Sequence, residues 1–316
     1  MPRVSVIIPT YNRSGMVNET IYSVLAQTEP DLEVIVVDDG SDDDTRKIIK
    51  AIEDDRVKYF YKDNGGPASA RNLGLAKALG EYMAFLDSDD FWPKDYLHVV
   101  LSHLESKGEF GGTYSPITVV YPDGSKVKSY KKPEGKSGWI TLDLFKRGFI
   151  WPSAAVIRSS VLENFWFDES VGKCCEDGDF FLRLSTQCRF LFVPDVEAFY
   201  RISEDSISTE VGVTCMRMLV LERFYFRLGG DEIVPAKIAR RRFSHACRKV
   251  AENRRRIGAR AAALKLYRRA IRYWPADMRL YPGLFKTLLL DSSKDTNPNW
   301  EMPEALGDPL GTNRFI

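Results

Sequence analysis

The sequence is poor in the residues that build zinc sites and disulfide frameworks. Its 316 residues include 3 histidines and 5 cysteines, and no CxxC pair stands beside a matching His or Cys cluster. A structural zinc site and a set of disulfides are therefore both poor interpretations. We expect reduced thiols, including the adjacent Cys174 and Cys175, in a cytosolic protein.

Other features are also missing. No apolar run approaches the ~18 residues that span a bilayer, and no basic-then-apolar leader precedes the first strand. We therefore expect a cytoplasmic protein, either free or attached peripherally to the cytoplasmic face of the inner membrane. The net charge is only +1, so the whole molecule is not a polyanion binder. The first strand is not followed by GxGxxG, so a dinucleotide would find no glycine cradle.

The first 90 residues alternate between strand and helix signals. Short β-branched apolar runs indicate buried strands, and apolar residues at helical spacing indicate the helices between them. The predicted strands are Val4–Ile8, Leu32–Val37, Val57–Tyr61 and Tyr82–Leu86, and the predicted helices are Val17–Leu25, Thr45–Ile52 and Ala68–Ala78. This alternation predicts a doubly wound α/β sheet with parallel strands.

From about Gly111 the pattern becomes mixed and then purely helical. The mixed part comprises a hairpin of Thr118–Tyr121 and Lys126–Tyr130, a helix beginning near Cys175, and strands Phe190–Val193 and Glu197–Tyr200. We expect a mixed α/β domain over residues 1–212, an all-helical extension over 213–290, and an extended or disordered tail over 291–316.

Polar residues gather where three predicted strands end. Strand one ends in Pro9-Thr10-Tyr11-Asn12, strand two in Asp38-Asp39-Gly-Ser, and strand four in Asp87-Ser88-Asp89-Asp90. Ligands of open α/β sheets bind beyond the carboxyl ends of the strands. These residues are therefore the candidate site.

The cluster Asp87–Asp90 has two interpretations. Crowded carboxylates repel one another unless a cation lies between them, and Mg²⁺ or Mn²⁺ takes a few carboxylates and completes its shell with phosphate oxygens. Alternatively, the turn caps the next helix, since Ser and Asp are good N-cap residues. Taken alone, an acidic turn is more often a cap.

The second strand end carries the same ambiguity. A cap of the helix that begins at Thr45 explains Ser41 and Asp42, but it does not explain Asp39, whose oxygens suit an N–H of a base such as uracil. Tyr11 offers a flat face for stacking. Arg71 and Asn72 open the third helix and can reach a phosphate or a ribose, although a lone Arg at such a position is commonly solvated.

Four ordered motifs make the chain recognisable. PTYNR, VVDDGSDDDT, NGGPASARNLGLAKALGEYMAFLDSDD and CEDGDFFLRL occur in this order over roughly residues 2–205, and together they resemble the family 2 glycosyltransferases of GT-A fold. Any one of them alone is weak.

The resemblance implies roles for individual residues. Tyr11 and the backbone of Pro9, Thr10 and Asn12 would hold the nucleobase, with Asp39 bonding its imide edge and Arg71 assisting. The family's DxD motif falls on Asp87, Ser88 and Asp89, with a divalent metal, Mn²⁺ or Mg²⁺, on Asp87 and Asp89. The family's catalytic base falls on Asp177 of the Glu176-Asp177 pair. Ser203 stands in Arg201-Ile-Ser203, where the family often has His, and that position's contribution is in doubt.

The implied function is an inverting, metal-dependent transfer of a sugar, of the hexosyltransferase type, from a nucleotide-sugar donor to a saccharide or lipid-linked acceptor hydroxyl. UDP is the favoured nucleotide, and the setting is cell-surface or extracellular polysaccharide synthesis. A carboxylate takes the acceptor's proton, and a cation neutralises the leaving diphosphate. Residues 1–110 would bind the nucleotide and residues 111–212 the acceptor.

Two rival functions remain open. One is a non-catalytic nucleotide-sugar-binding or scaffold protein, against which the intact Asp177 argues. The other is a phosphotransferase that uses Asp87 and Asp89, but such sites normally follow an early strand and carry Thr or Val two residues after the second Asp.

The helical extension carries an unbalanced charge. Between Ala236 and Arg272 there are fourteen Lys or Arg residues and one acid, Glu252. Such a stretch is either a solvated face or a surface that meets anionic lipid or a lipid-diphosphate acceptor. Nucleic acid is not an expected partner, because no recognised nucleic-acid module accompanies the charge.

Overall fold

The computed structural model describes residues 1–128, 135–171, 175–202, 211–291 and 295–296. The chain divides into two compact units, Met1–Leu144 with Phe149–Ser206, and Phe145–Gly148 with Ile207–Ile316. We describe each unit by itself. The division of the α/β domain into a nucleotide-binding half, residues 1–110, and an acceptor-binding half, residues 111–212, stays a prediction. The predictions for Ser203 and for the tail beyond residue 296 lie outside the described residues.

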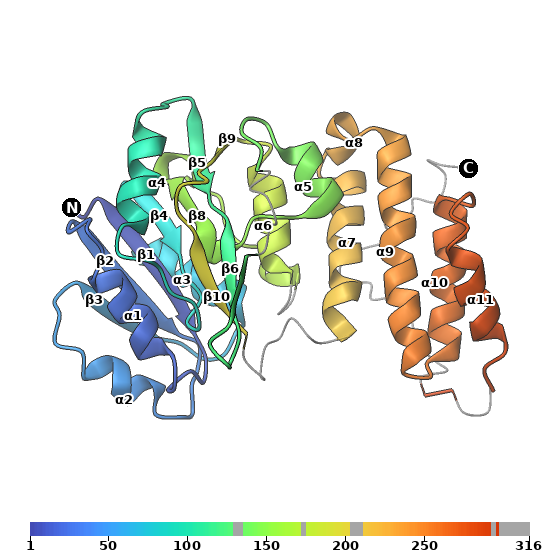
Figure 1. The fold of residues 1–316 in the computed structure, drawn as a ribbon, viewed down its shortest axis with the longest axis horizontal. Helices are drawn as coiled ribbons and strands as arrows, with labels where there is room; N and C mark the ends of the chain where they lie inside the picture. The colour runs from blue at the N-terminus through green and yellow to red at the C-terminus, as the bar shows by residue number, and fades with distance from the viewer. Residues whose placement is uncertain (129–134, 172–174, 203–210, 292–294, 297–316) are drawn as a thin grey trace. The chain divides into compact units, whose positions relative to one another are not determined.

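The first unit is built on a mixed sheet (Figure 1). Its strand order is β3-β2-β1-β4-β8-β5-β9, and a second sheet has the order β10-β6-β7. The strands are β1 (Val4–Thr10), β2 (Leu32–Asp38), β3 (Val57–Tyr61), β4 (Tyr82–Phe85), β5 (Phe110–Tyr114), β6 (Ile117–Val120), β7 (Lys126–Lys128), β8 (Ala155–Arg158), β9 (Arg189–Phe192) and β10 (Ala198–Arg201).

Strands β1 to β4 run parallel, and β8 pairs antiparallel with both β4 and β5. The helices of this part are α1 (Val17–Leu25), α2 (Thr45–Lys50), α3 (Pro67–Lys77), α4 (Tyr96–Glu105), α5 (Thr141–Arg147) and α6 (Glu176–Leu184), with 3-10 turns η1 (Pro152–Ala154), η2 (Ser159–Val161) and η3 (Glu169–Val171). The expectation of a doubly wound mixed sheet is thus confirmed. Helices α4 and α5 and strands β5 and β8 were not predicted.

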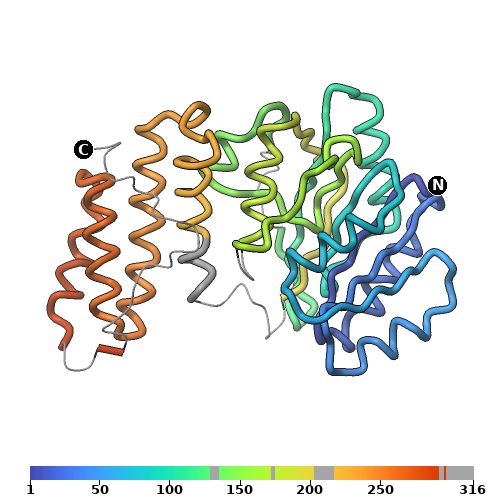
Figure 2. The backbone as a smooth tube through the Cα atoms, turned by 180° about the vertical axis from the view of Figure 1, so that it is seen from behind, coloured from blue at the N-terminus to red at the C-terminus, as the bar shows by residue number. Residues whose placement is uncertain are grey.

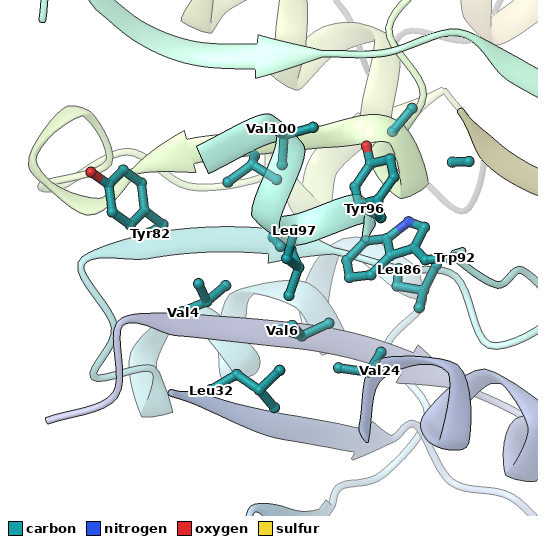
Figure 3. Packing of buried hydrophobic residues seen from close by; sticks show 14 of the residues in the cluster. Val4, Val6, Val24, Leu32, Tyr82, Leu86, Trp92, Tyr96, Leu97 and Val100 are labelled. Carbon is teal, nitrogen blue, oxygen red and sulfur yellow. The ribbon is translucent and has the colours of Figure 1, made fainter. Parts of the chain in front are cut away.

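Both faces of the sheet are covered. On one face, alternate residues of β1, β2 and β4 pack against α1 and α4, as Val6, Leu97 and Trp92 illustrate in Figure 3. On the other face α3 lies so close that a Cβ on Gly74 would stand 2.4 Å from Cγ2 of Ile7. This close approach explains why a glycine occupies the middle of α3. Strands β1 and β2 are buried throughout, so their carboxyl ends emerge from the core at one edge.

The second unit is helical, as predicted. It comprises α7 (Val211–Arg227), α8 (Gly230–Ile233), α9 (Ala236–Arg256), α10 (Arg260–Tyr273) and α11 (Leu280–Leu288), and the long helices lie side by side (Figure 2). Gly258, at φ +80°, follows the end of α9 in the left-handed conformation that terminates many helices. In the part of the chain that is described, no helix is long and apolar enough to span a bilayer.

Candidate functional site

The acidic cluster Asp87–Asp90 follows β4 and is held by hydrogen bonds to the hydroxyls of Thr20 and Ser153. The Thr20 hydroxyl donates to the carbonyl oxygens of Ser88 at 3.0 Å and Asp90 at 2.8 Å. The Ser153 hydroxyl donates to Oδ2 of Asp90 at 2.5 Å and accepts the N–H of Asp87 at 3.1 Å. The interpretation of the cluster as a helix cap is wrong, because the next helix begins only at Tyr96.

The carboxylates of this cluster are held in an unfavourable electrostatic environment. Burial, followed by the charge of Asp87, raises the pKa of Asp89 above its ordinary value. Burial, with Asp87 and Asp89 as the next causes, raises the pKa of Asp90 well above its ordinary value. Desolvation and like charge both disfavour an ionised carboxylate. A cation at this edge would therefore be attracted.

Arg71 joins the acidic cluster to the start of α6. Its guanidinium is buried and donates from Nη2 to Oδ1 of Asp87 at 2.7 Å and from Nη1 to Oε1 of Glu176 at 2.6 Å. It also lies 5.4 Å from the ring centroid of Phe167. The alternative of a solvated Arg71 is excluded, since this one buried side chain brings together two motifs that lie almost 90 residues apart in the sequence, and its role in ligand binding stays a prediction.

Helix α6 presents Glu176 and Asp177 in its first turn. Cys175, at φ +76°, turns the chain into the helix. Glu176 is buried, and burial raises its pKa to about 7 although Arg71 opposes the shift and Asp177 adds to it. Asp177 is half-buried, and its Oδ1 accepts the N–H of Gly178 at 2.7 Å. Acids in the first turn suit the helix dipole. The two acids differ, however, because Glu176 is buried and bound to Arg71, whereas Asp177 is half-buried.

The end of β1 contains one buried and one exposed candidate. Pro9 and Thr10 are buried in the strand, whereas Tyr11 is 46% exposed and offers its ring to solvent. The buried Thr10 hydroxyl has no hydrogen-bond partner among the residues described. Asn12, at φ +50°, accepts the N–H of Asp42 on its side-chain oxygen at 3.0 Å and donates its own N–H to Ser41 at 2.9 Å. Ser41 thus ties two strand ends together and does not cap α2, so that interpretation is corrected.

Asp39 is largely satisfied within the protein. Its Oδ1 accepts Nζ of Lys62 at 2.8 Å and the N–H of Gly65 at 2.9 Å, and its Oδ2 accepts the N–H of Gly66 at 2.7 Å. These bonds fix the turn that opens α3. One acceptor position of Oδ2 stays available for a base N–H, so recognition of uracil by Asp39 stays a prediction.

Three further residues of the site were not predicted. Nε of Arg13 lies 3.5 Å from Oδ2 of Asp89. Arg201 donates its N–H to Oδ1 of Asp90 at 3.1 Å and its Nε to the carbonyl of Asp89, and Ser153 completes the set. Arg13 and Arg201 do occur in the motifs, but their partners are not visible in sequence. Asn72, in contrast, uses its amide to hold the backbone of Phe167 at 2.9 Å.

The donor set fits a divalent cation. Asp87 and Asp89 supply two carboxylates, and Mg²⁺ or Mn²⁺ usually keeps several positions for water and phosphate oxygens. No group of three or more His, Cys, Asp or Glu side chains forms a complete metal site in the described ranges. The two acids would therefore share the ion with a phosphate, and metal binding stays a prediction.

A family model matches this region of the chain. Residues 5–166 match the model described as "Glycosyl transferase family 2". The match covers about half of the chain and includes every candidate residue from Pro9 to Asp89.

Curated relatives match over similar stretches. An uncharacterized glycosyltransferase of Rickettsia conorii is 49% identical over 104 residues, which are 33% of this chain and 17% of the relative. A GalNAc(5)-diNAcBac-PP-undecaprenol beta-1,3-glucosyltransferase of Campylobacter jejuni is 36% identical over 178 residues, which are 54% of this chain and 56% of the relative. The chain thus spans only part of the length of these relatives.

Solved structures match over most of the chain. TarS residues 1–349 of S. aureus in complex with UDP are 20% identical, with a TM-score of 0.62 over 91% of this chain and 88% of theirs. The complex with UDP-GlcNAc is 19% identical, with a TM-score of 0.59 over 89% of this chain and 92% of that one. At this identity the likeness shows the fold, which is GT-A with a helical extension.

Proposed function

Because the chain belongs to glycosyl transferase family 2, we propose that it moves a sugar from a nucleotide-sugar donor to an acceptor hydroxyl with inversion of the anomeric carbon. UDP is the nucleotide we expect. The acceptor is a saccharide or lipid-linked saccharide, and the product belongs to a cell-surface or extracellular polysaccharide or glycoconjugate.

One observation carries this proposal more than the others. The guanidinium of Arg71 bonds to Asp87 of the DxD motif at 2.7 Å and to Glu176 at 2.6 Å. Asp177 follows Glu176 directly, so these two ion pairs tie the residue next to the proposed base to the proposed diphosphate site. Inverting transfer requires these two functions on opposite sides of one reacting carbon.

Asp177 is the group we assign to the proton transfer. As the acceptor oxygen attacks the anomeric carbon, its O–H bond breaks and a carboxylate oxygen of Asp177 accepts the proton. The sugar–phosphate bond breaks in the same displacement, so the anomeric configuration inverts. General-base assistance of this kind contributes typically ~10²–10⁴-fold to the rate. Glu176 is less suited, because its carboxylate is already bound to Arg71.

The leaving diphosphate gains negative charge at the acidic edge. Asp87 and Asp89 would hold a divalent cation there, and such an ion supplies charge neutralisation of the phosphate oxygens. The buried Thr10 hydroxyl and the exposed Tyr11 ring support binding of a base and ribose at the end of β1, with Asp39 facing the imide edge.

The relatives support the substrate classes. TarS was solved with UDP and with UDP-GlcNAc, which favours a UDP-sugar donor here. The name of the Campylobacter relative describes glucosyl transfer to a saccharide on undecaprenol diphosphate, which favours a lipid-linked acceptor. An enzyme with such an acceptor would work at the cytoplasmic face of the membrane, and residues 236–272 are the part we propose for contact with anionic lipid.

A thermal-shift panel tests the proposal. Nucleoside diphosphates and their sugars are added with and without Mn²⁺, and slow hydrolysis of the stabilising sugar is then followed. A ligand at 100 times its Kd contributes roughly 2.7 kcal/mol, so UDP with Mn²⁺ should raise the melting temperature clearly. A scaffold protein would bind without hydrolysis, and a protein stabilised by no nucleotide would end the proposal.

A further inference from the structure

Two aromatic residues, Trp151 and Tyr200, belong to segments that contact the acidic cluster. Trp151 is 37% exposed and Tyr200 is half-buried. Their ring centroids lie 5.6 Å apart with an interplanar angle of 42°. The two residues come from separate segments of the first unit, so the pair is formed by the fold and not by local sequence.

Trp151 is fixed through the residues that follow it. It immediately precedes the turn η1, whose Ser153 hydroxyl bonds to the N–H of Asp87 and to Oδ2 of Asp90. A second tryptophan, Trp92, meets the same turn, since its Nε1 donates to the carbonyl of Ser153 at 2.7 Å, and it is only 3% exposed. Trp92 therefore belongs to the core, whereas Trp151 is partly exposed to solvent.

Tyr200 is fixed from both sides. Its predecessor Phe199 exchanges two backbone hydrogen bonds with Phe91 at 3.2 and 3.0 Å, and the rings of Phe91 and Phe199 stack at 4.8 Å. Its successor Arg201 bonds to Asp89 and Asp90. Strand β10 is thus joined to Phe91 and to the acidic cluster by the residues on either side of Tyr200, while the Tyr200 ring packs partly against the hydrophobic core and meets Trp151.

We propose that Trp151 and Tyr200 form a stacking platform for a pyranose ring at the accepting end of the acceptor. A pyranose has a face of C–H groups that packs against an aromatic ring, while its hydroxyls point outward to solvent or to a base. A linear polyol, or a serine or threonine hydroxyl, offers no such face. The inference rests on the proposed function and deepens it, because it selects a cyclic sugar as the acceptor class.

The geometry also explains why the platform lies where it does. The accepting hydroxyl must reach the anomeric carbon, which is bound to the diphosphate at Asp87 and Asp89. Trp151 lies two residues before Ser153, and Tyr200 lies one residue before Arg201. Ser153 and Arg201 contact the acidic cluster, so an acceptor sugar stacked on the two rings would lie next to that carbon. Binding sites for small molecules commonly combine aromatic walls with a few fixed polar groups.

Steady-state transfer with simple acceptors tests the platform. The donor is the UDP-sugar that the protein hydrolyses fastest, and the acceptors are the methyl glycosides of glucose, N-acetylglucosamine and N-acetylgalactosamine, with ribitol as the acyclic comparison. At least one pyranoside should be glycosylated, and ribitol should not. Trp151→Ala and Tyr200→Ala should each raise the KM of that pyranoside by about tenfold, the size expected of an aromatic contact, and should raise it more than the KM of the donor. Trp151→Phe should restore most of the loss.

Trp139→Ala is the matched control, since Trp139 is 62% exposed and takes part in none of the site contacts described above. It should leave both KM values as in the unchanged protein, and melting temperatures check that every variant folds. Equal use of ribitol and pyranosides, or a pyranoside KM that Trp151→Ala and Tyr200→Ala leave unchanged, would overturn the platform while donor hydrolysis still upholds the transferase. A protein that neither hydrolyses nor transfers from any nucleotide-sugar would remove the proposed function, and the platform with it.

Discussion

Buried carboxylates occur in both units, and their surroundings differ. In the helical unit, Glu222 is fully buried and accepts from Nε of Arg269 at 3.1 Å, from Nη2 of Arg269 at 2.8 Å and from the Tyr273 hydroxyl at 2.7 Å. At the edge of the sheet, Asp89 and Asp90 stand beside Asp87, and burial and like charge raise the pKa of both.

The comparison distinguishes a carboxylate with a structural role, Glu222, from the carboxylates of the proposed functional site. Glu222 has one cation and one hydroxyl directed at it, so its charge is compensated within the fold. The acidic edge places three carboxylates in four residues, and there burial and like charge outweigh the opposing arginines, so the pKa of Asp89 and of Asp90 stays raised. A folded protein tolerates such crowding where a ligand relieves it, which is why perturbed acids mark candidate sites.

The largest expected effect concerns the chemistry at α6. Asp177→Asn keeps the shape of the side chain but removes its ability to accept a proton. We expect transfer to fall ~10²–10⁴-fold, with donor binding and melting temperature nearly unchanged, as measured by transfer rates and calorimetry. Glu176→Gln is the comparison. Normal transfer by Asp177→Asn together with inactive Glu176→Gln would assign the base to Glu176.

The second prediction compares how the loss of Glu222 and the loss of Asp89 change the stability of the protein. Glu222→Leu leaves Arg269 buried without its partner, and breaking such a pair costs about 3–5 kcal/mol. Asp89→Asn removes one of the crowded charges, so the ligand-free protein should unfold at the same or a higher denaturant concentration.

The same variants should show the reverse order in binding. Asp89→Asn should lose the Mn²⁺-dependent part of UDP binding by calorimetry, whereas Glu222→Leu should keep it at temperatures where it is folded. Unchanged Mn²⁺-dependent affinity in Asp89→Asn would remove the metal assignment, and a marked loss of stability would make Asp89 a structural residue.

The third prediction is a pH dependence of stability. The pKa of Glu176 rises from 4.5 to about 7 on folding, so the folded state binds more protons than the unfolded state between these values. The stability associated with this group is fully present below pH 4.5 and is lost as pH rises through 7, by roughly 3 kcal/mol at most. Urea unfolding of the ligand-free protein from pH 4.5 to 8 measures the slope. Glu176→Gln should flatten it, and an unchanged slope in that variant would place the titration elsewhere.

Much of the parallel part of the sheet could be predicted from sequence because its strands are short apolar runs. The strand predicted at Val57–Tyr61 has the observed bounds, and the helix predicted at Ala68–Ala78 is observed at Pro67–Lys77. Strand β5 contains Gly111 and Gly112, which dilute its apolar pattern, so it was missed. A Cβ on Gly111 would lie 2.5 Å from Cβ of Cys188, which is a tertiary reason that no local pattern reveals.

The site could be predicted only in part, for a similar reason. Asp87 and Asp89 were proposed because they end a strand, and the acidic pair that opens α6 was proposed from its motif. Other parts of the site depend on contacts between distant segments, which sequence does not reveal. These are the ion pairs of Arg71 and the hydrogen bonds of Ser153 and Arg201 to the acidic cluster. A helix cap was one of two interpretations that the sequence left open for Ser41 and for the Asp87–Asp90 turn, whereas the fold uses these residues in contacts between separate segments.

The smallest expected effect concerns the basic helices α9 and α10. Several of their cations are used within the fold, since Arg269 pairs with Glu222 and Arg248 pairs with Glu252, and reversing these would disturb the helical unit. Lys265, Arg268 and Arg272 are exposed at helical spacing on α10, so changes there should alter the stability by no more than about 0.5 kcal/mol.

These three cations are therefore the right place to test contact with anionic lipid. The unchanged protein should pellet with vesicles that contain phosphatidylglycerol at low salt and be released at high salt, because surface charges are screened beyond ~8 Å at physiological ionic strength. Replacing Lys265, Arg268 and Arg272 by Glu should abolish pelleting and spare transfer to a soluble pyranoside. The control reverses Lys47, Lys50 and Lys77, which lie on α2 and α3 of the sheet unit, and should still pellet. A protein that ignores anionic vesicles at low salt would identify this face of α10 as merely solvated or as a surface for another protein.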